Sequence, residues 1–371
     1  MSNSILRDLV ALNMTLRLGM AEYERLVGVF GSHGALMEAS SGDLQRVGGL
    51  GARLAAEVAR LRTSDDPDEE LRQAAERGLT VLAFHDPTYP ALLRRIHNPP
   101  LVLYVEGALT EADAVAVAVV GTRHPTHYGT TQAARLTAEL AARGLTILSG
   151  LARGIDTVAH RSALDGGART VAVLGSGLAR LYPPENATLA DEVSGHGALV
   201  SEFPLHTPPW RSNFPRRNRI VSGLALGVLV IEAAGNSGAL VTADWALEQG
   251  REVFALPGRV DRRQSRGSHR LIKQGARLIE TSGDIIEGLG AVGEALAPAR
   301  PKPATPTLEL SGDEATVLGA IGDEPTHIDA ITDTCGLPAH QVAGVLMVLE
   351  IKKAVDQLPG KLFARTAATP L

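Results

Sequence analysis

The feature that most constrains the fold is a glycine-rich loop between an apolar run and a helical pattern. Residues 145–148 are typical of a buried strand, the loop Ser149–Asp156 carries two glycines and an arginine, and Val158–Leu164 is helical in pattern. In this order, strand, loop and helix direct free backbone N–H groups and the positive end of a helix dipole at one point. The segment therefore predicts an anion site, with a phosphate as the expected ligand.

The same alternation of strand and helix continues over the middle of the chain. Six short apolar runs are predicted strands: Val115–Val120, Thr146–Leu148, Thr170–Leu174, Ala198–Ser201, Val228–Ile231 and Glu252–Ala255. Two earlier runs, at 79–84 and 101–105, are expected to be preliminary strands. Apolar runs separated by helices indicate a parallel sheet covered on both faces. Ligands of such sheets bind at the carboxyl ends of the strands, near a switch in strand order.

The flanking segments differ from this middle part. Residues 1 to about 62 repeat apolar side chains at helical spacing, and residues 48–51 resemble the glycine turn of a helix-hairpin-helix. A sterile-α-motif-like (SAM-like) bundle and a purely structural turn are the alternatives. An Ala/Pro linker follows the alternation, and beyond it three helical patterns and a hairpin match a winged helix. We expect an α/β protein of four parts: a helical domain (1–64), an extended Rossmann-like domain (65–290), a linker (291–307) and a winged-helix-like domain (308–371).

Composition narrows the classes of function. A single cysteine, Cys335, excludes an internal disulfide and suits a reducing compartment. Neither a signal peptide nor a membrane-spanning run is visible, so we expect a cytoplasmic protein without a membrane partner. The net charge of −5 argues against attraction to DNA by the whole surface but leaves room for a local basic track. Lysine supplies only five of the 36 basic residues, and arginine, which supplies the rest, suits bidentate phosphate contacts.

Four loops are expected to meet at the carboxyl ends of the strands: Gly121–Arg123, Gly150–Asp156, Gly175–Gly177 and Ser237–Gly238. Each alone could be a tight turn, and Ser237 could simply cap its helix. Together, with arginines in two of them, they predict a groove for several phosphates. The expected phosphate-binding residues are Arg123, Gly150, Arg153, Gly154, Gly175, Ser176, Gly177, Arg180, Arg217, Asn218, Arg219, Ser237 and Gly238.

Several of these residues have a second interpretation. Arg217 and Arg219 could instead clamp carboxylates such as Glu202, and Asn218 could bond a base edge or a turn backbone. Tyr182 could stack on an unpaired base or pack in its turn. A further basic run, from Arg259 to Arg270, is either a solvated loop or a nucleic-acid rim.

Catalysis has little support in the sequence. A phosphate-binding Gly-x-x-x-x-Gly-Lys-Ser/Thr loop and a Gly-x-Ser-x-Gly elbow are both missing. His160 and Asp156 could form an acid–base pair, but a helix cap and a packed histidine are the simpler interpretation. His85, His124 and His127 are too scattered for a metal site. We therefore expect no catalytic residue, no metal and no cofactor.

Together these segments resemble the DNA-processing protein A family (DprA, also called Smf). The resemblance covers roughly residues 85 to 285 and rests on Val120–Arg123, Ser149–His160, Val171–Leu178 with Tyr182-Pro183, Phe214–Ile220, Glu232-Ala233 with Ser237–Thr242, and Pro257-Gly258. It implies an extended Rossmann fold that binds single-stranded DNA and helps to load RecA onto it, notably in natural transformation and recombination. Family members often carry a lysine after the Tyr-Pro pair. This chain has Pro184 there, which leaves Arg180 as a substitute.

The resemblance also implies partners. A homodimer contact would involve His269, Leu271, Ile272 and Leu278, with burial of Ile272 and Leu278 in the monomer core as the alternative. RecA and single-stranded-DNA-binding protein are expected partners. The winged helix could bind duplex DNA through Lys352 and Lys353 or dock a partner.

The alternative function is a nucleotide-processing enzyme of the phosphoribohydrolase type, whose fold is similar. Those enzymes carry a Pro-Gly-Gly-x-Gly-Thr-x-x-Glu loop. The corresponding segment here, residues 234–242, lacks the paired glycines and the closing glutamate.

Overall fold

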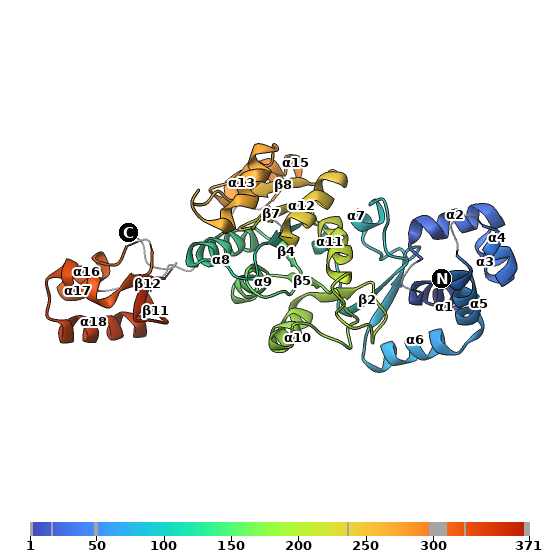
Figure 1. The fold of residues 1–371 in the computed structure, drawn as a ribbon, viewed down its shortest axis with the longest axis horizontal. Coiled ribbons are helices and arrows are strands. Elements are labelled where there is room, and N and C mark those ends of the chain that lie inside the picture. The colour runs from blue at the N-terminus through green and yellow to red at the C-terminus, as the bar shows by residue number, and fades with distance from the viewer. Residues whose placement is uncertain are drawn as a thin grey trace.

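The computed structural model describes residues 3–15, 18–47, 51–235, 237–296, 310–322 and 324–366. Figure 1 shows a helical N-terminal part, a central α/β part and a small C-terminal part at the opposite end. The predicted α/β class with helical and winged-helix flanks is confirmed.

The central part is built on a nine-stranded sheet with the order β1-β2-β6-β5-β4-β3-β7-β8-β9. Strands β3 to β9 all run parallel to one another, whereas β2 pairs antiparallel with both β1 and β6. The bounds are β1 Thr80–Ala83, β2 Val102–Gly107, β3 Ala116–Val120, β4 Thr146–Ser149, β5 Thr170–Val173, β6 Ala198–Ser201, β7 Gly227–Val230, β8 Glu252–Ala255 and β9 Arg277–Leu278. All six predicted strands of the alternation are present, and β9 was not predicted.

Helices cover both faces of this sheet because alternate side chains of each strand point to opposite sides. Ala118 and Val120 of β3 pack with α11 and α12, whereas Val117 and Val119 pack with α8 and α9. The bounds are α7 Ala91–Arg94, α8 His127–Ala142, α9 Ile155–Asp165, α10 Ala187–His196, α11 Asn213–Leu224, α12 Gly238–Glu248, α13 Arg266–Lys273, α14 Ser282–Gly288 and α15 Ala291–Glu294, with short 3-10 helices at Glu111–Ala114, Pro184–Asn186 and Arg263–Ser265. Helix α15 lies within the segment predicted as a linker, and residues 297–309 lie outside the described residues, so the linker stays a prediction.

The N-terminal part shares its core with the sheet. Its helices are α1 Asn3–Met14, α2 Met20–Phe30, α3 His33–Glu38, α4 Ser41–Arg46, α5 Ala52–Thr63 and α6 Asp66–Glu76. Leu9 and Leu26 belong to the same buried cluster as Val102 and Tyr104 of β2. Polar links also cross the junction: for example, Asn13 Nδ2 donates to the Glu202 carbonyl at 2.9 Å, and the Leu205 N–H donates to Glu70 Oε1 at 2.7 Å. The predicted glycine turn falls on residues 48–50, outside the described residues.

The C-terminal part has three helices and a three-stranded antiparallel sheet of order β10-β12-β11, the predicted winged-helix plan. Its elements are α16 Gly312–Gly319, β10 Thr326–His327, α17 Ile328–Cys335, α18 Ala339–Ile351, β11 Val355–Leu358 and β12 Leu362–Arg365. Val317, Ile331, Leu346 and Phe363 lie in its core.

Among the described residues, no single helix is long and apolar enough to cross a membrane. Helices α17 and α18 meet the length and composition criteria together, but they are bent by 111° at the break between them.

Candidate nucleic-acid interface

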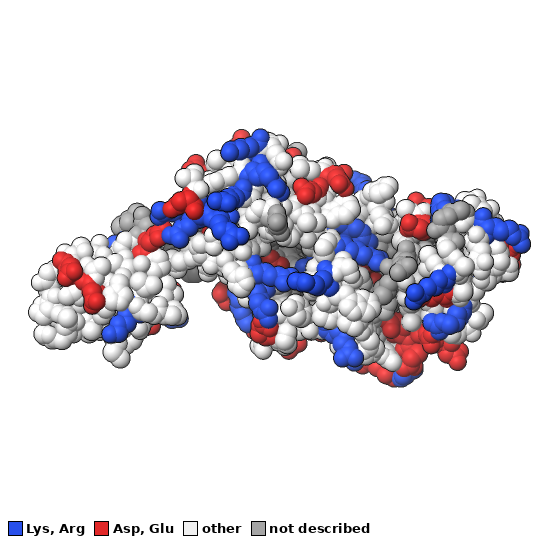
Figure 2. Space-filling model, in the orientation of Figure 1, with Lys and Arg blue, Asp and Glu red and all other residues white. Residues whose placement is uncertain are grey.

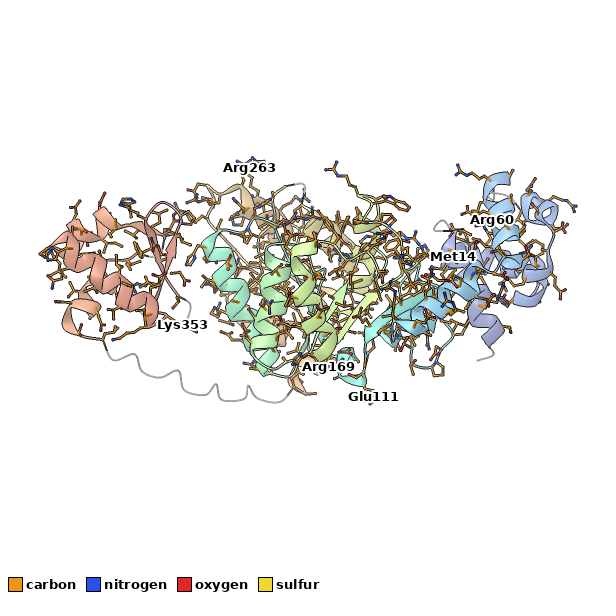
Figure 3. The ribbon with its side chains drawn as sticks, turned by 90° about the horizontal axis from the view of Figure 1, so that it is seen from below. Met14, Arg60, Glu111, Arg169, Arg263 and Lys353 are labelled. Atoms are coloured by element: carbon orange, nitrogen blue, oxygen red, sulfur yellow. The ribbon has the colours of Figure 1, made fainter. Side chains whose placement is uncertain are left out.

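A cavity of about 540 Å³ opens where the strand order reverses, between β3 and β7. The loops after β3, β4 and β7 and the start of α11 line it, as expected for the carboxyl edge of a doubly wound sheet. Figure 2 shows Lys and Arg side chains gathered around a hollow in the middle of this face. Figure 3 shows Arg263, a lining residue, on the opposite side of the sheet from Arg169 and Glu111.

Two arginines and two aromatic rings meet beside the cavity: Arg123 and Phe214 line it, and with Arg153 and Tyr182 they also line a small adjoining hollow. Arg123 lies over the Phe214 ring, 5.6 Å from guanidinium carbon to ring centroid, and Arg153 lies 6.0 Å from the Tyr182 centroid. The two rings contact edge to face, with centroids 5.7 Å apart. Arg153 also pairs with the exposed carboxylate of Glu185. The structure thus brings Arg123, Arg153 and Tyr182 together, as predicted.

Phe214 is the part of this cluster that was not singled out from the sequence. It lies within the basic stretch 211–219, and an aromatic residue interleaved with arginines is a signal for stacking on unpaired bases.

Arg217 forms the floor of the cavity and has a structural role. Its buried guanidinium donates from Nη1 to the carbonyl oxygens of Gly150, at 2.7 Å, and Val173. Burial lowers the pKa of Arg217 to about 10, so it keeps its charge at neutral pH. Arg217 thus holds the loop after β4 to α11 and places a positive charge beneath the cavity, and its direct contact with a phosphate stays a prediction.

Arg219 does not face the cavity, and its predicted phosphate contact is wrong. Its buried guanidinium binds both carboxylate oxygens of Glu202, at 2.8 and 2.7 Å, and its Nε donates to the Asn98 carbonyl. Glu202 is the carboxylate partner that the sequence offered as the alternative. Asn218 does line the cavity, and its Nδ2 donates to the Gly238 carbonyl at 3.0 Å, which fastens α11 to α12.

The glycine loop after β4 uses its N–H groups internally. Those of Gly150 and Ala152 donate to Asp156 Oδ2, at 3.1 and 3.3 Å, so a phosphate contact through the Gly150 N–H is wrong. Gly154 has a φ of +77°, and a Cβ there would lie 2.4 Å from the Thr122 carbonyl oxygen. Its absent side chain lets this loop pack against the loop after β3.

The Gly175–Gly177 loop is packed rather than open, so its predicted phosphate contacts are corrected. Ser176 is fully buried, and the Gly177 N–H donates to the Thr207 carbonyl at 2.9 Å. A Cβ on Gly175 would lie 2.8 Å from the Phe214 ring, so this glycine gives Phe214 its space. Arg180 is exposed, and its phosphate contact stays a prediction.

The N-terminal end of α12 forms another wall of the cavity. Ser237 caps this helix, with Oγ accepting the Ala239 N–H at 3.2 Å, and Ser237 and Gly238 both line the cavity. Arg263 and Arg266, from the basic run, line it as well. In the same run, Arg259 and Arg262 pair with Glu324 of the winged helix, at 2.6 and 3.1 Å.

His160 and Asp156 do not form an acid–base pair. His160 is fully buried, its Nδ1 lies 2.7 Å from Thr170 Oγ1, and burial lowers its pKa to about 3. Burial raises the pKa of the Asp156 carboxyl. The charge of Arg217 and the loop N–H groups act in the opposite direction, because they stabilise the carboxylate. Within the described residues no group of three or more His, Cys, Asp or Glu side chains could hold a metal ion.

Some of the residues predicted to contact a second copy of the chain or duplex DNA are buried or paired, and others are exposed. Leu271 is buried in the monomer, which corrects its place in a dimer contact, while Leu278 is 46% exposed and Ile272 is half-buried. His269 Nε2 lies 2.9 Å from the Gly258 carbonyl oxygen. In the winged helix, Lys352 is paired with Glu314 at 2.9 Å, whereas Lys353 is exposed.

Comparison with known proteins gives consistent matches. A family model described as DNA recombination-mediator protein A matches residues 80–290, and one described as the DprA winged helix domain matches residues 301–361. Protein Smf of Escherichia coli is 45% identical over 278 residues, 73% of this chain and 74% of that protein.

Two solved structures are similar in fold. DNA processing protein A (DprA) from Streptococcus pneumoniae has a TM-score of 0.65 and 31% identity, covering 77% of this chain and 98% of that one. DNA processing protein A from Helicobacter pylori, described for its single-stranded DNA binding mode, has a TM-score of 0.52 and 30% identity, covering 57% and 95%.

Proposed function

This chain belongs to the DNA recombination-mediator protein A (DprA/Smf) family, and on that premise we propose that it binds single-stranded DNA in the cavity between β3 and β7. The observation that carries the proposal is the pairing of Arg123 with Phe214 beside Arg153 with Tyr182. A cation and an aromatic face side by side suit the phosphate and the base of one nucleotide. The description of the Helicobacter pylori relative supports the same ligand.

We propose that the protein is a mediator and not an enzyme. Asp156 and His160 are engaged in holding the glycine loop and the core, and Thr242 stands where phosphoribohydrolases close their loop with glutamate. The bound strand is passed to RecA in natural transformation or recombination, in the cytoplasm, by a homodimer that joins two cavities. Single-stranded-DNA-binding protein is a further proposed partner, and the winged helix adds duplex binding through Lys353.

The test is the binding of fluorescent oligo-dT across a salt series. For the double variant Arg123→Ala with Arg153→Ala, we expect weaker binding and a slope of log affinity against log salt that is shallower by about 1.4, or about 0.7 for each lost phosphate contact. The matched control is Arg72→Ala with Arg161→Ala, because these arginines of α6 and α9 also have carboxylate partners and neither lines the cavity.

Three other outcomes would count against the proposal. If the wild type binds no oligo-dT, the function is wrong. If the double variant matches the control, the function stands and the site is wrong. Release of free base from adenosine monophosphate would contradict the non-enzyme assignment and favour the phosphoribohydrolase alternative.

A further inference from the structure

A second cavity lies beside the first, at the junction with the helical N-terminal part. It measures about 500 Å³ and is lined by residues of α5, of the segment before α11 and of α11 itself, among them Arg53, Trp210, Asn213 and Arg216. We propose that a single strand leaving the first cavity continues into this one, where Trp210 stacks on an unpaired base and Arg53 contacts a phosphate. This inference rests on the proposed function and extends it.

Trp210 is exposed to solvent. The residue is 51% exposed, an unusual state for one of only two tryptophans in the chain. Its backbone is held in the turn before α11, because its backbone N–H donates to the Pro208 carbonyl at 2.8 Å and its carbonyl accepts the Asn213 N–H at 2.9 Å. An exposed aromatic ring on an ordered backbone offers a face on which an unpaired base can stack, as in single-strand platforms.

The charges around Trp210 favour a phosphate backbone. Arg53 is exposed in the first turn of α5 and has no ion-pair partner among the described residues, and Arg211 next to Trp210 is also exposed. Arg216 pairs with Glu202 at 3.1 Å and lies over the Phe203 ring. Glu57 is the carboxylate in the lining, against the two arginines Arg53 and Arg216.

The two cavities are neighbours across a single helix. In α11, Asn213 and Arg216 line the second cavity, whereas Phe214, Arg217 and Asn218 line the first. A helix is about 10 Å across with its side chains. A nucleic-acid strand in the first cavity therefore needs to pass over only the first part of α11 to reach Trp210. Figure 2 shows further basic side chains between the central hollow and the helical part.

The junction is rigid enough for one strand to use both sides. The helical part shares its core with β2 and is tied to the sheet through Asn13 and Glu70. Arg53, from the helical part, therefore keeps a constant position relative to Trp210, from the α/β part. We commit to an unpaired nucleic-acid strand as the occupant because the arginines and the exposed ring match its two components.

The experiment measures affinity against the length of oligo-dT. We expect the wild type to gain affinity at the length that reaches the second cavity. Trp210→Ala should remove this gain, weakening long strands by about 5- to 150-fold, the range expected for one stacked base. Short strands should bind Trp210→Ala as they bind the wild type. Trp210→Phe should keep part of the gain, and Arg53→Ala should lower it and reduce the salt slope, while Arg60→Ala, from an exposed position of the same helix, should leave both unchanged.

Fluorescence gives a direct readout. In Trp245→Phe, Trp210 is the sole tryptophan, and long strands should quench it more than short ones; Trp210→Phe, which keeps the half-buried Trp245, should show little quenching. Unchanged long-strand affinity in Trp210→Ala would overturn the second site, and the first would stand if Arg123→Ala still weakens binding. A wild type that binds no strand of any length would overturn both.

Discussion

The guanidinium of Arg217 lies directly against Gly150. Its Nη1 donates to the Gly150 carbonyl oxygen at 2.7 Å, and a Cβ added to Gly150 would lie 2.5 Å from Nη2. Position 150 thus requires a glycine, because the Arg217 guanidinium occupies the space that a side chain would need. The loop, α11 and the end of β5 are joined through one buried cation.

Gly150→Ala should destabilise the fold, because the Arg217 guanidinium is buried and cannot withdraw from the added methyl group. We expect a loss of about 1–3 kcal/mol in the free energy of unfolding, measured by denaturant titration. Gly166→Ala is the control, since its nearest contact would be 3.5 Å from the new Cβ. Equal stability of the two variants would contradict this account of Gly150.

Stability should fall in mild acid because of His160. Its pKa is about 3 in the folded state and about 6.5 when unfolded, so between these values the unfolded state binds the extra proton. The free energy of unfolding then decreases as the pH falls, by about 2 kcal/mol between pH 7 and pH 5 from this residue. His160→Gln should lack this component in urea titrations at the two pH values. An identical pH dependence in the variant and the wild type would refute it.

Glu324→Gln should strengthen DNA binding. Glu324 occupies the guanidinium groups of Arg259 and Arg262, two members of the basic run beside the cavity. Without this carboxylate, Arg262 can face phosphates, whereas Arg259 keeps its ion pair with Asp261. We therefore expect up to about a 5-fold gain at low salt that fades as salt rises. Glu350→Gln, at an exposed position of α18, is the control in the same titration. A loss of affinity in Glu324→Gln would show that the ion pair supports binding instead.

Leu278→Glu should abolish the proposed homodimer without harming the monomer. Leu278 is 46% exposed at the edge strand β9, so a charge there is tolerated in the monomer but not in an apolar contact. Analytical ultracentrifugation should report a monomer with an unchanged melting temperature. Leu247→Glu, at a 57% exposed position of α12, should remain dimeric. A dimer that survives Leu278→Glu would place the contact elsewhere.

Six parallel strands, β3 to β8, were predictable because each is a short, mostly apolar run bounded by turn residues, whereas β9, Arg277–Leu278, is too short and too polar to show such a pattern. The alternation of strands and helices predicted a cavity at the carboxyl edge of the sheet, but the strand order that places it between β3 and β7 came from the structure. The role of Arg217 was not predictable, because its partner Gly150 is distant in sequence. For Arg219 the sequence offered Glu202 as one of two interpretations but could not decide between them.

The glycine loops show the same limit. The small residues at 175–177 indicate that another group packs closely against this loop. The sequence alone does not show whether that group is a ligand or the Phe214 ring. Asp156 was expected to cap its helix, but α9 has no side-chain cap, and the Asp156 carboxylate instead accepts the two loop N–H groups that a phosphate would need.

The shared core of the helical part and β2 changes how deletion variants of this chain should be interpreted. Removing residues 1–64 would uncover Val102 and Tyr104 of β2, which are fully buried in the core that β2 shares with the N-terminal helices. The shortened chain would then expose an apolar face of the sheet to solvent, and such a face promotes self-association. A loss of DNA binding in such a truncated chain would therefore reflect a destabilised sheet. Point substitutions are the better way to test what the first 64 residues do.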